Sequence, residues 1–442
     1  MDSGFRRVDE AKKIPHYKGG NIIYGKLLNS SDRFFKEKGE RMNLPLNGIR
    51  VLEMAHAVMG PSCGMVLADM GAEVIKVERA PDGDETRKLI GFGRGFHVYF
   101  NRNKKSLAVD LKAEKGKELL KKMVPHCDVF VENFGPGTVT KLGFGYEELA
   151  RINPRLVYCS LKGFMKGPYE HRPALDEVVQ MMGGLAYMTG PPGRPLRAGA
   201  SIIDIMGGSY GVIGILTALY EREKTGKGQH VTATLFEATA FLMGQHMALS
   251  ALTKEPVPPM PKRVSSWAIY DVFKCRDGED VFIGVTSDRQ WKLFCEHFGM
   301  TELAADASLA TNNQRVHARE RMLPQVRARF AQMSKSELMD TCERAGLPYA
   351  PIVRPQELFD DPHLNASGGF AEITLADGRR VKTPKLPFEM DGRRFGAELD
   401  VPVAGSHTRE LLAGLGYSAA AIDRLMQEGV IGAGGTSIGK EA

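Results

Sequence analysis

The chain has 442 residues, a length that favours two domains, or one large domain with a smaller one inserted, over a single compact core. Hydrophobic residues make up 43% and charged residues 25%, a balance that excludes a disordered protein. Its net charge is only +6, so nothing calls for a nucleic-acid partner. The six cysteines form no CxxC pair and no His cluster has metal-ligand spacing, which argues against a metal site or a disulfide framework. The sequence shows neither a bilayer-spanning apolar run nor a secretory signal, so we expect a cytoplasmic protein without a membrane partner.

The first 41 residues differ in texture from the rest of the chain. Residues 1–41 are polar and mixed in charge, without a sustained apolar period, as is typical of a flexible extension. Residues 36–41 can all be encoded by purine-rich codons, as a ribosome-binding sequence translated in frame would be. This gives the hypothesis that Met42 is the true start.

Strands and helices alternate from residue 48 onward. The predicted strands lie at residues 48–54, 74–78, 106–111, 128–132 and 156–160, and the predicted helices between them at 63–70 and 115–124. Such alternation favours a parallel sheet covered on both faces, which is an α/β fold. We expect residues 42–255 to form the N-terminal part of this large domain.

The middle of the chain predicts two long helices followed by a linker. A stretch rich in Gly and Met at 173–193 precedes a long apolar helix at 205–223 and a second helix at 233–252. Four prolines in 255–261 indicate a linker.

Beyond the linker, the pattern predicts a smaller α+β domain over 262–354. It contains a hairpin, with strands at 270–275 and 281–285 joined at Asp277-Gly278, and helices at 289–298 and 324–345. Residues 355–442 are expected to return to the large domain through short strands and a last helix pair after residue 405.

The first βαβ unit raises the possibility of nucleotide binding. Glu78 sits where a ribose-binding acid would, although a polar strand end explains it equally well. The turn at 56–61 lacks the three spaced glycines that let a backbone approach a pyrophosphate. The sequence therefore argues against nicotinamide binding.

Five blocks, in order along the chain, carry a family resemblance. They are residues 67–78, 101–106, 131–137, 225–229 and 405–408. On these blocks the sequence resembles, from residue 46 to 431, the class III CoA-transferases, which include formyl-CoA transferase and the carnitine CoA-transferases and are close relatives of the α-methylacyl-CoA racemases. The resemblance implies a large Rossmann-like domain, a smaller α+β domain and an interlocked homodimer.

Asp204 directly precedes the long apolar helix predicted at 205–223. An Asp in this position would be a good N-cap for stability alone. The catalytic aspartate of the family falls just before this helix, so the resemblance implies that Asp204 is the nucleophile. The two roles are compatible, because a helix N-terminus stabilises an ionised carboxylate and only the ionised form attacks.

The resemblance further implies the reaction. CoA would move from an acyl-CoA donor, such as succinyl-CoA, to a small carboxylic or dicarboxylic acid, through an aspartyl anhydride and an aspartyl-CoA thioester. Gly207 and Gly208 could expose N–H groups to the thioester oxygen, although close helix packing explains them as well. The family's tetraglycine loop has no counterpart near 265–267.

CoA needs cations for its phosphates and a niche for adenine. The resemblance places coenzyme A against Val58, Met59, Arg79, Val109, Lys112, Asn133, Phe134, Gly135 and Lys141. Arg79 and Lys112 suit phosphate oxygens, although a single surface cation is more often just solvated.

Further candidates flank Asp204. Asp176 lies where the racemases carry His-Asp, and we interpret it as a pocket residue or a helix cap. Leu175 replaces that His, which weakens the racemase alternative, because racemisation needs two opposed acid–base groups. Arg172, Arg194 and Arg197 could bind the second carboxylate of a dicarboxylate such as succinate.

Three classes of function therefore remain open from the sequence. They are CoA transfer between carboxylic acids, α-methylacyl-CoA racemisation and CoA binding without catalysis. The acceptor acid cannot be identified from the sequence.

Overall fold

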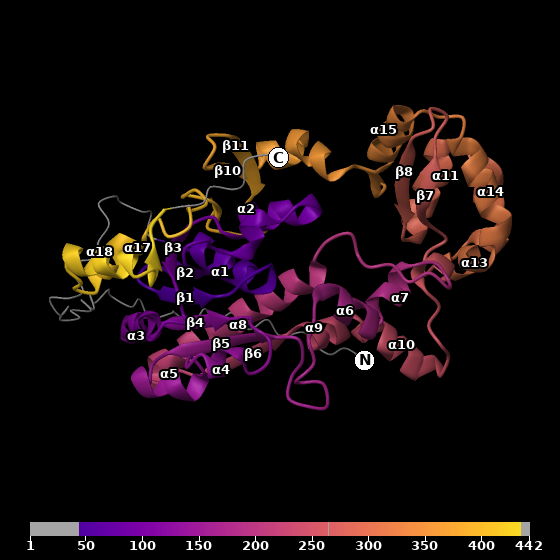
Figure 1. The fold of residues 1–442 in the computed structure, drawn as a ribbon. Coiled ribbons are helices and arrows are strands. Elements are labelled where there is room, and N and C mark those ends of the chain that lie inside the picture. The colour runs from indigo at the N-terminus through magenta and orange to yellow at the C-terminus, as the bar shows by residue number, and fades with distance from the viewer. Residues whose placement is uncertain (1–43, 264, 435–442) are drawn as a thin grey trace, which may run out of the picture. The chain divides into compact units, whose positions relative to one another are not determined.

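The computed structural model describes residues 44–263 and 265–434; the predicted extension at 1–41 and the proposed start at Met42 lie outside them. A seven-stranded sheet in the order β14-β3-β2-β1-β4-β5-β6 organises this part of the chain (Figure 1). Six of its strands run parallel, and β14 pairs antiparallel with β3 at one edge. The predicted α/β fold with a mostly parallel sheet is confirmed.

The strands of this sheet largely match the predicted ones. They are β1 (Arg50–Met54), β2 (Glu73–Arg79), β3 (Lys104–Val109), β4 (Val129–Glu132), β5 (Val157–Lys162), β6 (His230–Thr234) and β14 (Ile431–Gly432). The strand predicted at 106–111 begins two residues earlier, because it pairs with β2 over its whole length. The prediction missed β6, whose β-branched residues pair with β5 where a helix was expected to begin.

Alternation along each strand divides the apolar residues between two cores. Val51 points to the core under α1 (Met59–Asp69) and α8 (Ile202–Thr225), whereas its neighbour Leu52 points to the opposite core. The second core lies under α3 (Glu114–Met123), α5 (Tyr146–Ile152), α17 (Thr408–Gly414) and α18 (Ala419–Gln427). Both faces of the sheet are thus covered, as the sequence predicted.

The long helix α8 begins three residues earlier than predicted. It starts at Ile202, so Asp204 lies inside the first turn instead of preceding it. Among residues 44–263 and 265–434, α8 is the one helix that is long and apolar enough to cross a membrane, where the sequence analysis found no such run. Its packing against α1, β5 and β6 is that of a core helix.

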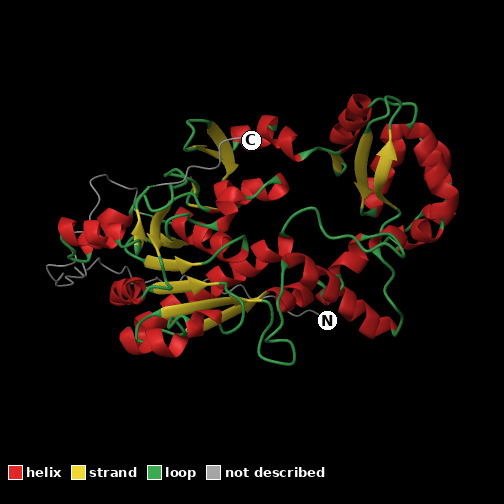
Figure 2. Cartoon of the chain, viewed as in Figure 1, coloured by secondary structure: helices red, strands yellow, loops and turns green. Residues whose placement is uncertain are grey.

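The expected hairpin is confirmed, with its own hydrophobic core. Strands β7 (Ile269–Lys274), β8 (Asp280–Val285) and β9 (Tyr349–Pro351) form an antiparallel sheet beside α11 (Asp288–Phe298), α14 (Arg319–Phe330) and α15 (Lys335–Ala345) (Figure 2). The helix predicted at 324–345 is two helices, because Ser334 and Glu337 form a capping box that starts α15. The predicted boundaries of this small domain, 262 and 354, stay a prediction.

The remaining elements connect these layers. They are α2 (Arg94–Phe100), α4 (Thr138–Lys141), α6 (Asp176–Met182), α7 (Leu185–Thr189), α9 (Leu235–Leu242), α10 (Gly244–Thr253), α12 (Thr301–Ala305), α13 (Asn312–His317), α16 (Pro362–Ala366), β10 (Phe370–Thr374), β11 (Arg380–Pro384), β12 (Glu389–Met390) and β13 (Arg393–Arg394). The helix predicted at 233–252 is divided at Met243 into α9 and α10. The last helix pair, α17 and α18, is confirmed.

All six cysteine thiols are free, and all are buried in these cores. Within the described residues, no group of three or more His, Cys, Asp or Glu side chains is arranged to hold a metal ion.

Candidate active site

A cavity of ≈ 380 Å³ lies at the carboxyl ends of β1, β4 and β5. From β1 the chain proceeds to β2 and β3 on one side of the sheet, and from β4 to β5 and β6 on the other. The sheet order therefore reverses between β1 and β4, and parallel sheets bind their ligands at such a point.

The cavity gathers nine of the residues that the sequence predicted. Its lining includes Val58, Met59, Asn133, Phe134, Gly135, Arg172, Asp176, Arg197 and Asp204. These residues come from the turns after β1 and β4, the beginnings of α1, α6 and α8, and the segments that precede α6 and α8. The predicted nucleophile and several predicted CoA ligands thus share one cavity.

Asp204 is the third residue of α8 and is partly buried. Its backbone N–H donates a 3.0 Å hydrogen bond to Asp176 Oδ2. No side chain in the described part of the chain donates a hydrogen bond to the Asp204 carboxylate. Burial and the nearby charge of Asp176 raise the pKa of Asp204 to about 7, although Arg197 opposes the shift.

Asp176 is the residue that caps α8. This buried carboxylate, at the start of α6, accepts hydrogen bonds through Oδ2 from the backbone N–H of Ile203 (2.8 Å) and Asp204 (3.0 Å). Its Oδ1 accepts a hydrogen bond from Gln180 Nε2. The capping function that the sequence assigned to Asp204 therefore belongs to Asp176, which satisfies the first N–H groups of the helix from a distant part of the chain.

The three candidate arginines differ in their partners. Arg197 is held by Glu177 and by the carbonyl oxygens of Ala198 and Ala200, each 3.0 Å away. Arg172 lies over the Tyr169 ring at 5.0 Å and is exposed, and no described carboxylate lies within ion-pair distance of it. Arg194 does not line the cavity. Arg172 is therefore the arginine of the cavity whose charge is available to a ligand.

Four predicted CoA ligands do not line this cavity. Arg79 lies 3.5 Å from Asp82 and 3.2 Å from Glu85 in exposed ion pairs. Lys112 and Lys141 are exposed, and Val109 is buried within β3. The position of the cavity therefore does not support a ligand shared by these four residues.

Gly207 and Gly208 lie in the interior of α8, where it crosses α1. A Cβ at Gly207 would lie 2.5 Å from Met59 Cε, and one at Gly208 would lie 2.2 Å from Ser62 Oγ. Past the first turn, backbone N–H groups bond within the helix. Close packing thus accounts for both glycines, and neither lines the cavity.

Sequence reasoning missed several residues of the lining. The most notable is Lys162 at the end of β5, which lies 2.6 Å from Glu132 Oε2 and donates a 2.8 Å hydrogen bond to the Phe134 carbonyl. Others are His56, Ala57, Phe92, Phe96, Pro136, Leu161, Gly163, Pro173, Ala174, Leu175, Glu177, Ser201 and Leu235. A useful signal was available for Lys162, because it follows closely on the strand predicted at 156–160.

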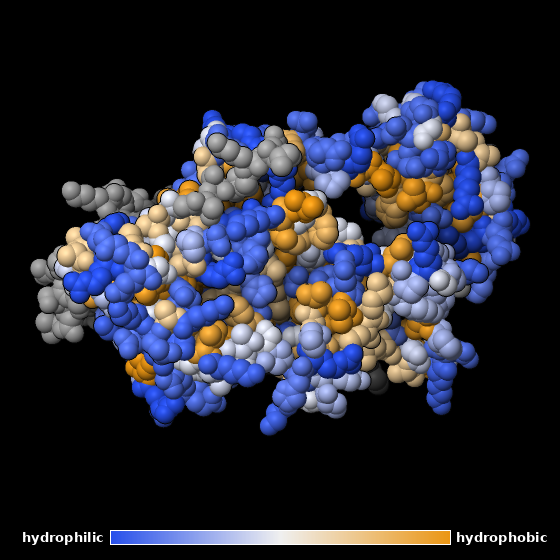
Figure 3. Space-filling model, viewed as in Figure 1, coloured by the Kyte–Doolittle hydropathy of each residue, from blue (hydrophilic) through white to orange (hydrophobic). Residues whose placement is uncertain are grey.

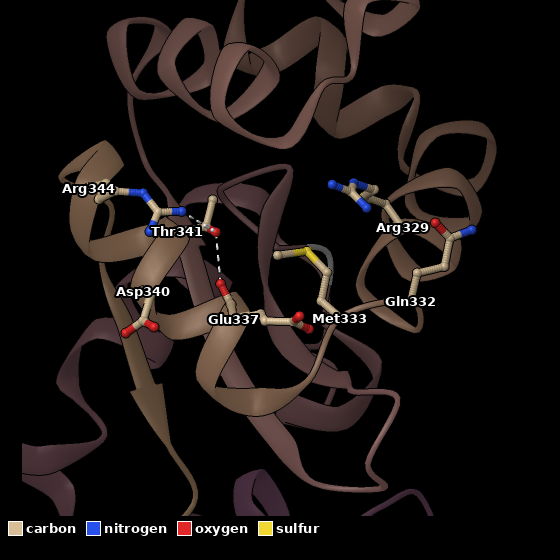
Figure 4. Close-up of a pocket in the computed structure, with 7 residues that line it drawn as sticks. All are labelled: Arg329, Gln332, Met333, Glu337, Asp340, Thr341 and Arg344. Carbon is tan, nitrogen blue, oxygen red and sulfur yellow. Dashed lines mark hydrogen bonds between the residues drawn. The ribbon is translucent and has the colours of Figure 1, made fainter.

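A second cavity, of ≈ 360 Å³, lies against α14 and α15 (Figure 4). It is lined by Arg329, Gln332, Met333, Glu337, Asp340, Thr341 and Arg344. Arg344 donates a 3.0 Å hydrogen bond to Thr341, and acidic side chains share the lining with the two arginines. No residue predicted from the sequence lies here, so the candidate active site is the cavity of Asp204.

Comparison with known proteins identifies the family of the chain. Residues 46–408 match CoA-transferase family III. The chain is 32% identical to a succinyl-CoA:glutarate CoA-transferase of Mus musculus over 88% of this chain and 90% of that one, and 37% identical to an acetyl-CoA:oxalate CoA-transferase of Acetobacter aceti over 79% and 90%. The crystal structure of a CAIB/BAIF family protein from Brucella suis, 32% identical, superposes with a TM-score of 0.75 over 84% of this chain and 100% of that one. The chain therefore belongs to CoA-transferase family III and is an acyl-CoA:carboxylate CoA-transferase.

Proposed function

We propose that this transferase moves CoA from an acyl-CoA donor, with succinyl-CoA as the first candidate, to a small dicarboxylic acid through covalent intermediates on Asp204. The observation that carries the proposal is the Asp204 carboxylate, which lines the cavity without a hydrogen-bond donor among the described side chains. A carboxylate held at the start of a helix by its own backbone is positioned to attack, and its oxygens are not occupied by other bonds.

In the first half of the cycle, Asp204 takes CoA from the donor. A carboxylate oxygen of Asp204 attacks the thioester carbonyl carbon, the C–S bond breaks, and the products are a mixed anhydride and CoA thiolate. The thiolate attacks the aspartyl carbonyl carbon of the anhydride. The donor leaves as its carboxylate, and CoA stays on Asp204 as a thioester.

In the second half, the acceptor repeats these steps in reverse. Its carboxylate attacks the aspartyl thioester and expels CoA thiolate, forming a second anhydride. The thiolate then attacks the acceptor carbonyl carbon, which releases the Asp204 carboxylate and the new CoA ester. No proton, water or electron is consumed over the cycle.

Arg172 supports a dicarboxylate as the acceptor. One carboxylate of the acceptor must reach Asp204, so a second would lie elsewhere in the cavity and needs a cation. Lys162 and Arg197 are paired with Glu132 and Glu177, whereas the Arg172 guanidinium faces no described carboxylate. Guanidinium groups bind carboxylates with two parallel hydrogen bonds.

The test of this proposal is to trap the covalent intermediate. The protein is incubated with succinyl-CoA and then with hydroxylamine, and peptide mass spectrometry locates the modified residue. We expect an adduct on Asp204 that disappears when glutarate, oxalate or another accepted acid precedes hydroxylamine. Exchange of CoA between acids without any adduct on Asp204 would contradict the proposed mechanism.

No feature of the site favours the racemase alternative. Both oxygens of Asp176 accept hydrogen bonds from the protein, so this carboxylate is not free to move a proton at an α-carbon. Leu175 lines the cavity where the racemases carry a His. Deuterium incorporation at the α-carbon of an acyl-CoA would reverse this assignment.

We also propose that the protein works as an interlocked homodimer in the cytoplasm. The ten residues of α10 include none that is buried in the described chain, although Met247, Leu249 and Leu252 are large and apolar. Hydrophobic side chains also gather on the surface over α2 and over α8 and α9 (Figure 3). Exposed apolar side chains gathered in this way support a protein partner. Light scattering should give a dimer that dilution does not dissociate; a monomer would exclude it.

A further inference from the structure

Residues 55–61, which comprise the turn after β1 and the first residues of α1, form one wall of the active-site cavity. His56, Ala57, Val58 and Met59 all line the cavity. Ala57 has a φ of +60°, in the left-handed region that disfavours every residue with a Cβ. Some other part of the protein must therefore hold this wall in place.

The side chain of Asn133 holds the turn next to Ala57. Its Oδ1 accepts a 2.9 Å hydrogen bond from the His56 backbone N–H, and its Nδ2 donates a 2.8 Å hydrogen bond to the His56 carbonyl oxygen. Both polar groups of the amide are thus engaged by one residue of the turn. The fit is close, because a Cβ at Gly60 would lie 3.1 Å from Asn133 Cγ.

Two buried lysines fasten the ends of the same turn. Lys76 Nζ donates a 2.8 Å hydrogen bond to the Ala55 carbonyl, and Lys104 Nζ donates a 2.9 Å hydrogen bond to the Pro61 carbonyl. Both side chains are fully buried, and both pair with Glu53. These two lysines therefore fix the ends of the segment. Beside Ala57, the Val58 carbonyl accepts a 2.8 Å hydrogen bond from the Ser62 N–H as α1 begins, and the Asn133 side chain binds the backbone of His56 on the other side.

We propose that Asn133 is a positioning residue, which keeps Ala57 left-handed and so builds the wall against which the CoA ester binds. This differs from the direct contact with CoA that the family resemblance implies for Asn133. The inference rests on the proposed function, because it assigns a task within the same site. Without the two hydrogen bonds, Ala57 would relax toward negative φ and the wall would move.

The experiment uses Ala57 to separate positioning from direct contact. In the full-length protein, Asn133→Ala should weaken CoA binding about tenfold by titration calorimetry, since two hydrogen bonds are lost. Adding Ala57→Gly should restore most of the affinity, because glycine adopts positive φ without a steric cost. In turnover, KM for the acyl-CoA should follow the same order, and KM for the acceptor acid should stay unchanged.

Asn153 provides the matched control. Its Nδ2 donates hydrogen bonds to the carbonyls of Val124 (3.1 Å) and Cys127 (2.9 Å), and it does not line the cavity. Asn153→Ala should lower the melting temperature and leave the affinity for CoA unchanged. Asn133→Asp, which keeps the acceptor but cannot donate to the His56 carbonyl, should bind CoA with intermediate affinity and covers the case in which Asn133→Ala folds poorly.

Two results would overturn the inference. One is a double variant, Asn133→Ala with Ala57→Gly, that binds CoA as weakly as Asn133→Ala, because a lost direct contact cannot be restored at Ala57. The other is an Asn133→Ala protein with unchanged affinity. Since CoA binding is measured without turnover, a protein that binds CoA as expected but forms no adduct on Asp204 would contradict the proposed function alone.

Discussion

Glu78, at the carboxyl end of β2, and Asp204, at the start of α8, are acidic side chains that the protein treats in opposite ways. Glu78 accepts hydrogen bonds from Arg87 (2.7 and 2.6 Å), from Ser106 Oγ (2.7 Å) and from the Asp84 N–H (2.8 Å). Burial would raise the pKa of Glu78, but the bonds and charge of Arg87 outweigh it and hold the pKa at about 2. Asp204 has no such donors, and its pKa rises to about 7.

The difference shows that burial alone does not decide the state of a carboxylate. Donors around Glu78 fix its charge and tie β2 to β3 and to the segment at 402–405. Around Asp204 the protein supplies a second carboxylate, Asp176, in place of a donor. Glu78 is therefore satisfied by its neighbours, whereas Asp204, the proposed nucleophile, is left unsatisfied at a cost in stability.

Replacing Asp204, the proposed nucleophile, should have the largest effect on catalysis. Asp204→Asn keeps the shape of the side chain but removes the attacking oxygen anion, so we expect kcat to fall at least about a thousandfold. The measurement is exchange of CoA between succinyl-CoA and an accepted acid. Asp204→Asn turning over at the wild-type rate would remove Asp204 from the mechanism.

Replacing the structural acid should mainly affect stability. Glu78→Gln leaves the buried Arg87 guanidinium without a counter-charge, so we expect the free energy of unfolding to fall by about 3–5 kcal/mol. The urea midpoint measures this loss, and Asp377→Asn, which breaks an exposed pair with Arg379, should cost less than about 1 kcal/mol. Equal losses in both variants would show that the buried pair has no special weight.

Replacing Asp204 should also affect stability. It should raise the free energy of unfolding, whereas replacing Glu78 should lower it. Because the pKa of Asp204 is raised in the folded state, ionisation destabilises the fold as the pH rises from about 4 through 7. Asp204→Asn should therefore be more stable than the wild type at pH 8 by about 2 kcal/mol, allowing for partial exposure, and the gain should vanish near pH 4. A gain that is the same at both pH values would contradict the raised pKa.

Arg172, which faces no described carboxylate, should affect the KM for one class of acceptor acid selectively. Arg172→Ala should raise KM for a dicarboxylate acceptor about tenfold or more and leave KM for a monocarboxylate unchanged, because only the former has a second carboxylate to lose. Arg194→Ala, outside the cavity lining, is the control. Equal effects on both kinds of acid would leave Arg172 without a part in acceptor choice.

The smallest expected effect concerns the negative charge of Asp176, which lies beside Asp204, the proposed nucleophile. Asp176→Asn removes a negative charge that raises the pKa of Asp204, so the midpoint at which kcat increases with pH should move below 7 by about half a unit to one unit. The Asn side chain keeps an oxygen that can cap α8. A pH–rate profile of both proteins measures the shift, and a midpoint moved upward would contradict this coupling.

Asp204 and Asp176 also show how much of the candidate site can be predicted from the sequence. Asp204 could be proposed as the nucleophile from the sequence, because an acid beside an apolar helix, within blocks that resemble a family, is a local signal. The cap by Asp176 could not, since 28 residues separate it from Asp204 and nothing in the spacing indicates which carboxylate meets which N–H. For the same reason the sequence left two explanations open for Gly207 and Gly208, exposed N–H groups or close helix packing, and contact with α1 favours the second.

The sheet was easier to predict than the edges of its elements. The alternation of strands and helices predicted a parallel sheet, because continuous apolar strands need helices on both faces. Strand β6 was missed where its β-branched residues run into α9, and the start of α15 was missed although the capping box of Ser334 and Glu337 is readable in the sequence. Local hydrogen bonds set these boundaries, and hydrophobic periodicity does not resolve them.

The burial of every cysteine has a practical consequence for work on this enzyme. The proposed cycle twice releases CoA as a thiolate, and an accessible protein thiol beside it could form a mixed disulfide under oxidising conditions. Since all six thiols are enclosed in the cores, a chromogenic thiol reagent should see almost only the coenzyme while the protein stays folded. Because each CoA thiolate is consumed by the next step of the cycle, colour that develops during turnover would report CoA that has escaped into solvent, and the enzyme itself should tolerate air.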